Sequence, residues 1–132
     1  MGTSLAGTGR RDPVERLNVE LESFELVLLR RPPDAPAYDE ETLNRIQREH
    51  LSYLATLRTS GEIATNGPVT DQPDKSLRGL AFYRTGSLAR ARELAEADPA
   101  VRAGRLVVEV MTWLCPPGAL RSAGHAITLP DD

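Results

Sequence analysis

The sequence predicts an α+β fold with six elements in the order strand, helix, strand, strand, helix, strand. Four short runs have the length and the apolar or alternating pattern of strands: residues 24–30, 63–69, 79–84 and 105–114. Apolar residues recur at steps of three and four over residues 40–60 and 87–97, as they do along one face of a helix. Proline, glycine and polar residues separate these segments, so each boundary has its own local signal.

The first two elements are a buried strand and a long helix. Residues 24–30 are apolar on both faces in their centre and are followed by Pro32, which cannot continue a sheet ladder, so we expect a central strand. Asp39 is a suitable N-cap, because acidic residues fill the turn that follows it. The helix over residues 40–60 is expected to end at Gly61, which tolerates the left-handed conformation of a C-terminal stop.

The second and third strands are expected to pair with each other. The second strand, residues 63–69, runs into Gly67-Pro68, and the polar residues 70–76 follow it. The third strand then covers residues 79–84. A polar loop of this kind between two short strands predicts an antiparallel hairpin.

The second helix begins after Ser87, a good N-cap residue, and covers residues up to about Ala97. Asp98 and Pro99 then start a short helical turn, because Asp is a good N-cap and Pro is favoured at the first helical position. Gly104 is expected to close this turn.

The last strand, residues 105–114, has two apolar faces. One face carries Leu106, Val108, Val110 and Leu114, and the other carries Val107, Glu109, Met111 and Trp113. With right-handed crossovers, the six elements form a ferredoxin-like βαββαβ fold, in which two helices cover one face of a four-stranded antiparallel sheet. Since the uncovered face is also apolar, we expect a homodimer that forms through the sheet faces.

The composition limits the classes of protein and partner. A chain of 132 residues is long enough for one core, and a net charge of −3 gives no reason to expect nucleic acid or an anionic membrane as a partner. No apolar run approaches the ~20 residues that span a bilayer. The single cysteine, Cys115, fits a reducing compartment, so we expect a cytoplasmic protein.

Residues 23–118 are expected to form the folded domain. Residues 1–22 are interpreted as a disordered leader, because no hydrophobic stretch of signal-peptide length follows the basic pair Arg10-Arg11. Residues 119–132 are interpreted as a C-terminal tail, in which a short strand is considered at residues 126–129.

His50 is the strongest candidate for a functional residue. It lies seven residues from both Leu43 and Leu57, so it is on or beside the buried stripe of the first helix. One interpretation is a structural histidine that hydrogen bonds to a backbone carbonyl. The other is a general acid or base, because an imidazole with an ordinary pKa of about 6.5 exchanges protons near neutrality.

Asp98 is the natural partner for His50, because the end of the second helix can approach the first helix on the same side of the sheet. Asp before Pro99 is also a common N-cap, so the capping role and the role of an orienting carboxylate both remain open. A carboxylate that reaches the imidazole would fix its tautomer and raise the basicity of the other ring nitrogen.

Four further residues are candidates for substrate binding: Tyr53, Gly67, Pro68 and Trp113. The Gly-Pro pair equally suits a turn, and the two aromatic residues equally suit the core or a dimer interface. No metal is expected, because a site would have to combine His50, His125 and carboxylates without any ligand spacing. The chain also has no glycine-rich phosphate loop and no GxSxG or HExxH motif.

Three stretches in order resemble the YciI-like (YCII-related) family: residues 48–54 (REHLSYL), Gly67-Pro68 after the second strand, and residues 95–104 (AEADPAVRAG) before the last strand. The resemblance covers about residues 23–120. It implies a ferredoxin-like fold of the dimeric α/β-barrel group, a homodimer, and an active site built on a histidine-aspartate pair. The matching residues here are His50 and Asp98. Some relatives of this fold group are cofactor-free enzymes that act on small, often aromatic or lactone substrates.

Three functions are consistent with the sequence. The first is an enzyme without a cofactor, in which His50, oriented by Asp98, moves a proton in a lyase-like elimination or an isomerisation of a small organic substrate. The second is a non-catalytic, small-molecule-binding or regulatory dimer, since the sequence has no nucleophile or metal site that requires catalysis. The third is a cofactor-independent monooxygenase of the same fold group.

Overall fold

The structure, a computed structural model, describes residues 19–120 and Thr128. The expected N-terminal leader lies outside the described residues except for residues 19–22, and the strand considered at residues 126–129 lies outside them except for Thr128. In the described part of the chain, no helix is both long enough and apolar enough to cross a membrane.

The described residues form four strands and three helices. In chain order these are β1 (Glu22–Arg30), α2 (Glu40–Ser60), β2 (Ile63–Pro68), β3 (Leu77–Tyr83), α3 (Leu88–Glu96), α4 (Pro99–Arg102) and β4 (Val107–Cys115). The predicted βαββαβ order is confirmed, and α4 is the short turn predicted after Asp98.

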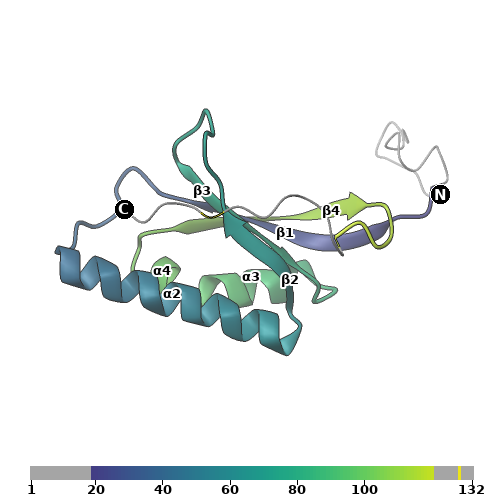
Figure 1. The fold of residues 1–132 in the computed structure, drawn as a ribbon, viewed down its shortest axis with the longest axis horizontal. Coiled ribbons are helices and arrows are strands. Elements are labelled where there is room, and N and C mark those ends of the chain that lie inside the picture. The colour runs from purple at the N-terminus through teal and green to yellow at the C-terminus, as the bar shows by residue number, and fades with distance from the viewer. Residues whose placement is uncertain (1–18, 121–127, 129–132) are drawn as a thin grey trace.

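The strands form one antiparallel sheet in the order β2-β3-β1-β4. β1 is therefore a central strand, as its continuous apolar run predicts, with β3 on one side and β4 on the other. Figure 1 shows two layers, with α2, α3 and α4 all on one side of the sheet. The ferredoxin-like α+β architecture is thus confirmed.

Two strands begin two residues earlier than predicted. β1 begins at Glu22, because this residue pairs with Cys115 at the end of β4. β3 begins at Leu77, because this residue pairs with Arg30 beyond a register shift in β1. As a result, Arg78 lies in β3, whereas the predicted strand begins one residue after it.

The predicted ends of the helices are confirmed at the level of individual hydrogen bonds. The side chain of Asp39 accepts a hydrogen bond from the N–H of Thr42 at 2.8 Å, and that of Ser87 accepts one from the N–H of Arg90 at 3.1 Å. Gly61 ends α2 with φ of 87°, a conformation that residues with a Cβ rarely adopt.

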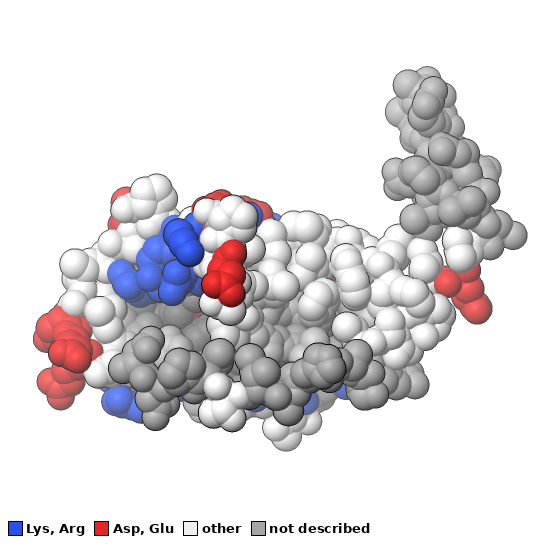
Figure 2. All heavy atoms as spheres, turned by 45° about the horizontal axis from the view of Figure 1, so that its top comes forward, with Lys and Arg blue, Asp and Glu red and all other residues white. Residues whose placement is uncertain are grey.

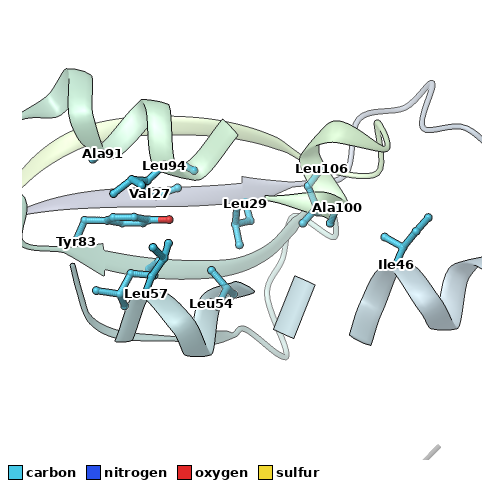
Figure 3. Close-up of a cluster of buried hydrophobic side chains, with 13 residues drawn as sticks. Val27, Leu29, Ile46, Leu54, Leu57, Tyr83, Ala91, Leu94, Ala100 and Leu106 are labelled. Carbon is cyan, nitrogen blue, oxygen red and sulfur yellow. The ribbon is translucent and has the colours of Figure 1, made fainter. Parts of the chain in front are cut away.

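The hydrophobic core lies between the sheet and the helices (Figure 3). Thirteen buried residues of the described chain form it: Val27, Leu29, Ile46, Leu54, Leu57, Ile63, Ala81, Tyr83, Ala91, Leu94, Ala95, Ala100 and Leu106. The members on α2 recur at helical steps and point the same way as His50, which is also buried. The packing that stabilises α2 therefore also directs the histidine toward the interior.

A buried carboxylate fixes the loop that precedes α3. Glu25 on β1 is only 6% exposed, and it accepts hydrogen bonds from the N–H and the hydroxyl of Thr85 at 2.8 and 2.7 Å. Its second oxygen accepts one from the N–H of Gly86 at 3.2 Å. These bonds satisfy the buried charge and tie the start of α3 to the centre of the sheet.

The opposite face of the sheet carries an aromatic cluster of Phe24, Phe82 and Trp113, and the ring centroids of Phe82 and Trp113 are 4.9 Å apart. Val107 and Met111 are 45% and 38% exposed. In Figure 2, where the upper side of Figure 1 is turned toward the viewer, much of the described surface is uncharged and basic side chains gather toward one end. This face is the one for which the sequence predicts a partner.

Candidate active site

His50 and Asp98 form a buried hydrogen bond although 48 positions separate them in the sequence. The Nδ1 atom of His50 lies 2.7 Å from the Oδ2 atom of Asp98. The exposed fractions of the two residues are 9% and 1%. A hydrogen bond this short between two buried groups holds the imidazole ring in one orientation.

Local structure on two helices places the pair. His50 lies one turn after Ile46 and one turn before Leu54 on the buried stripe of α2. Asp98 is the N-cap of α4, and its Oδ1 atom accepts a hydrogen bond from the N–H of Ala100 at 2.8 Å. The two interpretations of Asp98 therefore apply together, because one carboxylate oxygen caps the helix and the other binds the histidine.

The hydrogen bond assigns the ring nitrogens of His50. A carboxylate can only accept, so Nδ1 carries the hydrogen in the neutral ring and Nε2 keeps its lone pair. Among the described residues, no hydrogen-bond partner is found for Nε2. This is the arrangement of a histidine that is ready to accept a proton from a ligand.

A cavity of about 200 Å³ adjoins the histidine between α2 and the β2-β3 side of the sheet. The described residues that line it are Leu29, Arg31, Gln47, His50, Leu51, Leu54, Asn66, Gly67, Pro68, Arg78, Gly79, Leu80 and Leu106. The structure thus brings Gly67 and Pro68, two of the predicted substrate-binding residues, to the same cavity as His50. Asp98 meets the ring of His50 and is not among the lining residues.

Tyr53 is described in the structure but is not among the described residues that line this cavity. Its hydroxyl donates a hydrogen bond to the carbonyl of Leu94 at 2.8 Å and so joins α2 to α3. Burial raises the pKa of Tyr53, and the negative charge of Asp98 raises that pKa further. The hydroxyl therefore remains a donor throughout the neutral range.

Trp113 also lies outside the cavity lining. It is on β4 opposite Phe24, and its ring packs with Phe24 and Phe82 on the sheet face that the helices leave uncovered. The two aromatic candidates are thus on opposite sides of the sheet, and neither reaches the cavity next to His50 in the described chain.

Arg31 and Arg78, which are not among the candidates predicted from the sequence, both line the cavity. Arg31 comes directly after β1, and Arg78 comes early in β3, at the position where these two strands pair. The sequence shows one basic residue directly after β1 and another near the start of β3. Whether the two arginines lie side by side, however, depends on the order of the strands in the sheet. Gln47 is one turn before His50 on α2, so helical spacing could have identified it.

Among the described residues, no group of three or more His, Cys, Asp and Glu side chains could hold a metal ion. The second histidine, His125, lies outside the described residues.

The fold and the site together define a ferredoxin-like α+β domain with a histidine-carboxylate pair beside a small cavity. The YCII-related domain matches residues 26–114, which is more than half of the chain, and the chain therefore belongs to the YCII-related family. The resemblance seen in the sequence is confirmed.

One of the solved structures that match this chain is similar over most of the domain. It is 5-chloro-2-hydroxyhydroquinone dehydrochlorinase from Burkholderia phenoliruptrix, in complex with 2,5-dihydroxybenzoquinone. The TM-score is 0.50 at 23% sequence identity, and the match covers 68% of this chain and 92% of that chain. This similarity shows a shared fold. A comparison with curated proteins finds no match.

Proposed function

We propose that this chain is a lyase-type enzyme that uses His50, oriented by Asp98, for general acid-base chemistry on a small organic substrate without a cofactor. The observation that carries the proposal is the 2.7 Å hydrogen bond between Nδ1 of His50 and Oδ2 of Asp98, on a histidine that lines a cavity. A buried, oriented imidazole, with one ring nitrogen that has no hydrogen-bond partner in the described part of the chain, is suited to proton transfer.

In the proposed reaction, the substrate binds in the cavity and Nε2 of His50 removes a proton from it. The electron pair of the broken bond to hydrogen forms a new double bond, and a leaving group departs with the electron pair of its own bond. The net change is the loss of one hydrogen and one leaving group. In an isomerisation, the imidazolium returns the proton to another atom of the substrate.

Asp98 contributes in two ways to this proposal. Its Oδ2 atom keeps the hydrogen on Nδ1, so that Nε2 is the basic nitrogen, and its negative charge stabilises the imidazolium that forms. Its Oδ1 atom is held by the N–H of Ala100, which fixes the carboxylate. Positioned general acid-base catalysis of this kind contributes about 100-fold to 10,000-fold in rate.

The neighbouring structure supports the reaction class. Dehydrochlorination is an elimination, and the enzyme named for that reaction shares this fold. The cavity of this chain, about 200 Å³ with several leucine side chains in its wall, suits a small substrate with an apolar body. In this proposal Gly67 and Pro68 contact the substrate, whereas Tyr53 joins α2 to α3.

We further infer that the functional unit is a homodimer formed through the uncovered sheet face. The support is the exposure of Val107 and Met111 beside the aromatic cluster that includes Trp113. We also infer a reducing compartment such as the cytoplasm, because the chain has a single cysteine, the buried and unpaired Cys115.

The experiment is a substrate screen followed by one substitution. Chlorinated hydroquinones, including 5-chloro-2-hydroxyhydroquinone, are assayed for chloride release, and small lactones and enols are assayed for elimination or isomerisation. For any compound that is turned over, His50→Asn should lower kcat by about 100-fold or more. Arg92→Gln, on the exposed surface of α3, is the control and should leave the rate unchanged. Binding without turnover across the screen would favour the non-catalytic alternative.

A further inference from the structure

Two arginines share the cavity wall with His50. Arg31 follows the last residue of β1 and is half-buried, whereas Arg78 is on β3 and is exposed to solvent while lining the cavity. The pairing of Arg30 with Leu77 places the two arginines at one end of neighbouring strands. Sheet topology therefore brings two cationic groups to the site of the proposed proton transfer.

Neither arginine is neutralised by an ion pair within the described residues. Arg30, the neighbour of Arg31, forms ion pairs with Asp74 at 3.1 Å and with Glu109 at 2.8 Å. By contrast, Nε of Arg31 donates to the carbonyl of Arg105 at 3.0 Å. A carbonyl oxygen orients a guanidinium group but carries no charge, so the positive charge of Arg31 remains available to a ligand.

Arg78 is held in the same manner. Its Nη1 atom donates to the carbonyl of Lys75 at 3.4 Å, and no carboxylate among the described residues pairs with it. No Asp or Glu is found among the described residues that line the cavity. The nearby carboxylate of Asp98 is bound to His50 and to the N–H of Ala100. The cavity wall therefore has local positive charge in a chain with a net charge of −3.

The arginines also repel one another. Burial lowers the pKa of Arg31, and the positive charges of Arg105 and Arg78 lower that pKa further. A negatively charged group placed between these side chains would relieve the repulsion, because it interacts favourably with each of them. The planar guanidinium group also matches a carboxylate or two neighbouring oxygens with paired hydrogen bonds.

Resting on the proposed function, we propose that the substrate is a small organic anion whose negatively charged oxygen is bound by Arg31 and Arg78, next to the proton that His50 removes. The rest of the wall suits the apolar body of such a molecule, since it includes the leucines of α2 and β1. The guanidinium groups of these arginines would also stabilise the negative charge that develops when a proton leaves a carbon next to a carbonyl or hydroxyl group.

Binding of matched probes tests this substrate class without any need for turnover. Benzoate carries a carboxylate, 2,5-dihydroxybenzoquinone carries acidic hydroxyl groups, and benzamide is a neutral analogue of benzoate. Binding is followed by amide chemical shifts in solution at low salt. We expect benzoate, the quinone or both to bind at least about 10-fold more tightly than benzamide, and added salt to weaken the anions alone. The anion that binds with the higher affinity identifies the charged group that the site prefers, a carboxylate or an ionised hydroxyl.

Variants locate the charge that is responsible. Arg31→Gln and Arg78→Gln should each weaken anion binding by about 10-fold and leave benzamide binding unchanged. Arg31→Lys, which keeps the charge but loses the planar fork, should restore part of the affinity. Arg92→Gln removes the same charge from the surface of α3 and should have no effect.

Two outcomes would overturn the anionic substrate class. The first is that benzamide and both anions bind equally well, or that none of the three binds. The second is that neither Arg31→Gln nor Arg78→Gln changes the affinity for the anions. His50→Asn separates this inference from the proposed function. This variant should still bind the anion, because the arginines are intact, while losing any turnover. Anion binding that depends on the arginines, together with full turnover by His50→Asn, would contradict the catalytic role and leave the anion site standing.

Discussion

The Oδ2 atom of Asp98 lies 2.7 Å from Nδ1 of His50, while the Oδ1 atom of the same carboxylate lies 2.8 Å from the backbone nitrogen of Ala100. One side chain thus links the first turn of α4 to the middle of α2. The orientation of His50 and the start of α4 therefore both depend on Asp98. Substitutions of Asp98 can separate its role as a helix cap from its role in orienting the histidine.

Asp98→Asn should preserve the fold and change the histidine tautomer. The amide oxygen can still accept the N–H of Ala100, so stability should change little. The amide nitrogen, however, would donate to Nδ1 and move the hydrogen of the ring to Nε2. Nitrogen-15 chemical shifts of the His50 ring measure this change directly, and kcat for any substrate found should fall by about 100-fold or more.

Asp98→Ala provides the comparison, because it removes the cap as well as the orienting carboxylate. Its free energy of unfolding should fall by about 1 kcal/mol or more relative to Asp98→Asn. If Asp98→Asn kept both the wild-type ring shifts and the wild-type kcat, the orienting role of Asp98 would be wrong.

Glu25→Ala should destabilise the domain by about 2 kcal/mol, because it leaves the donors of Thr85 and Gly86 without their charged acceptor. Urea unfolding followed by circular dichroism measures the change. Glu93→Ala, which removes a carboxylate from the exposed surface of α3, is the control and should cost less than about 0.5 kcal/mol. Equal stabilities of the two variants would contradict the role given to Glu25.

The N-cap of α2 should make stability depend on pH. Hydrogen bonds from the side chain and the backbone of Thr42 lower the pKa of Asp39 below its ordinary value of 3.8. The charged cap therefore contributes stability above pH 3.8, and this contribution is lost as the pH falls through the lower pKa of the folded state. The stability difference between wild type and Asp39→Ala should be largest near neutral pH and should shrink in acid.

Asp39→Ser is the matched control for this pH dependence, because a serine hydroxyl caps the helix without titrating. Its advantage over Asp39→Ala should be the same at neutral and acidic pH. Thermal unfolding of the three proteins at both pH values makes the comparison. A difference between wild type and Asp39→Ala that stays constant down to about pH 2 would exclude the charged cap as the cause.

The uncovered sheet face should form a dimer interface. Sedimentation equilibrium should give twice the chain mass of 14.4 kDa for the wild type. Met111→Glu should shift the equilibrium toward the monomer, because it places a charge on the exposed apolar face. Thr59→Glu, on the exposed surface of α2, should leave the dimer intact. A wild-type mass of 14.4 kDa at high concentration would show that this face has no self-association.

Local sequence signals were sufficient for most of the fold. The start of α2 follows from the side chain of Asp39, and its end follows from the backbone of Gly61, so no tertiary information is needed. The start of β3 depends instead on pairing with β1 across the sheet, which no local pattern encodes. For that reason the predicted third strand begins only at Gly79, after Leu77 and Arg78.

The same distinction applies to the site. The contact between His50 and Asp98 could be predicted from the sequence. His50 lies on the buried stripe of α2, Asp98 is the N-cap of α4, and the fold places both helices on one side of the sheet. Arg31 and Arg78 could not, because their shared cavity exists only once β1 and β3 lie side by side. The placement of Tyr53 also required the structure, since a tyrosine at that helical position fits a pocket and a helix-helix contact equally well.

The most direct measurement of the central claim is the rate at which a substrate loses its reacting hydrogen in heavy water, followed by proton NMR, because that signal disappears both in an elimination and in an exchange with solvent. If His50 removes that proton, the signal should disappear with the wild type and His50→Asn should slow its loss by about 100-fold or more, with binding retained. Loss of the signal at the wild-type rate in a folded His50→Asn protein would contradict a role for the histidine as the base.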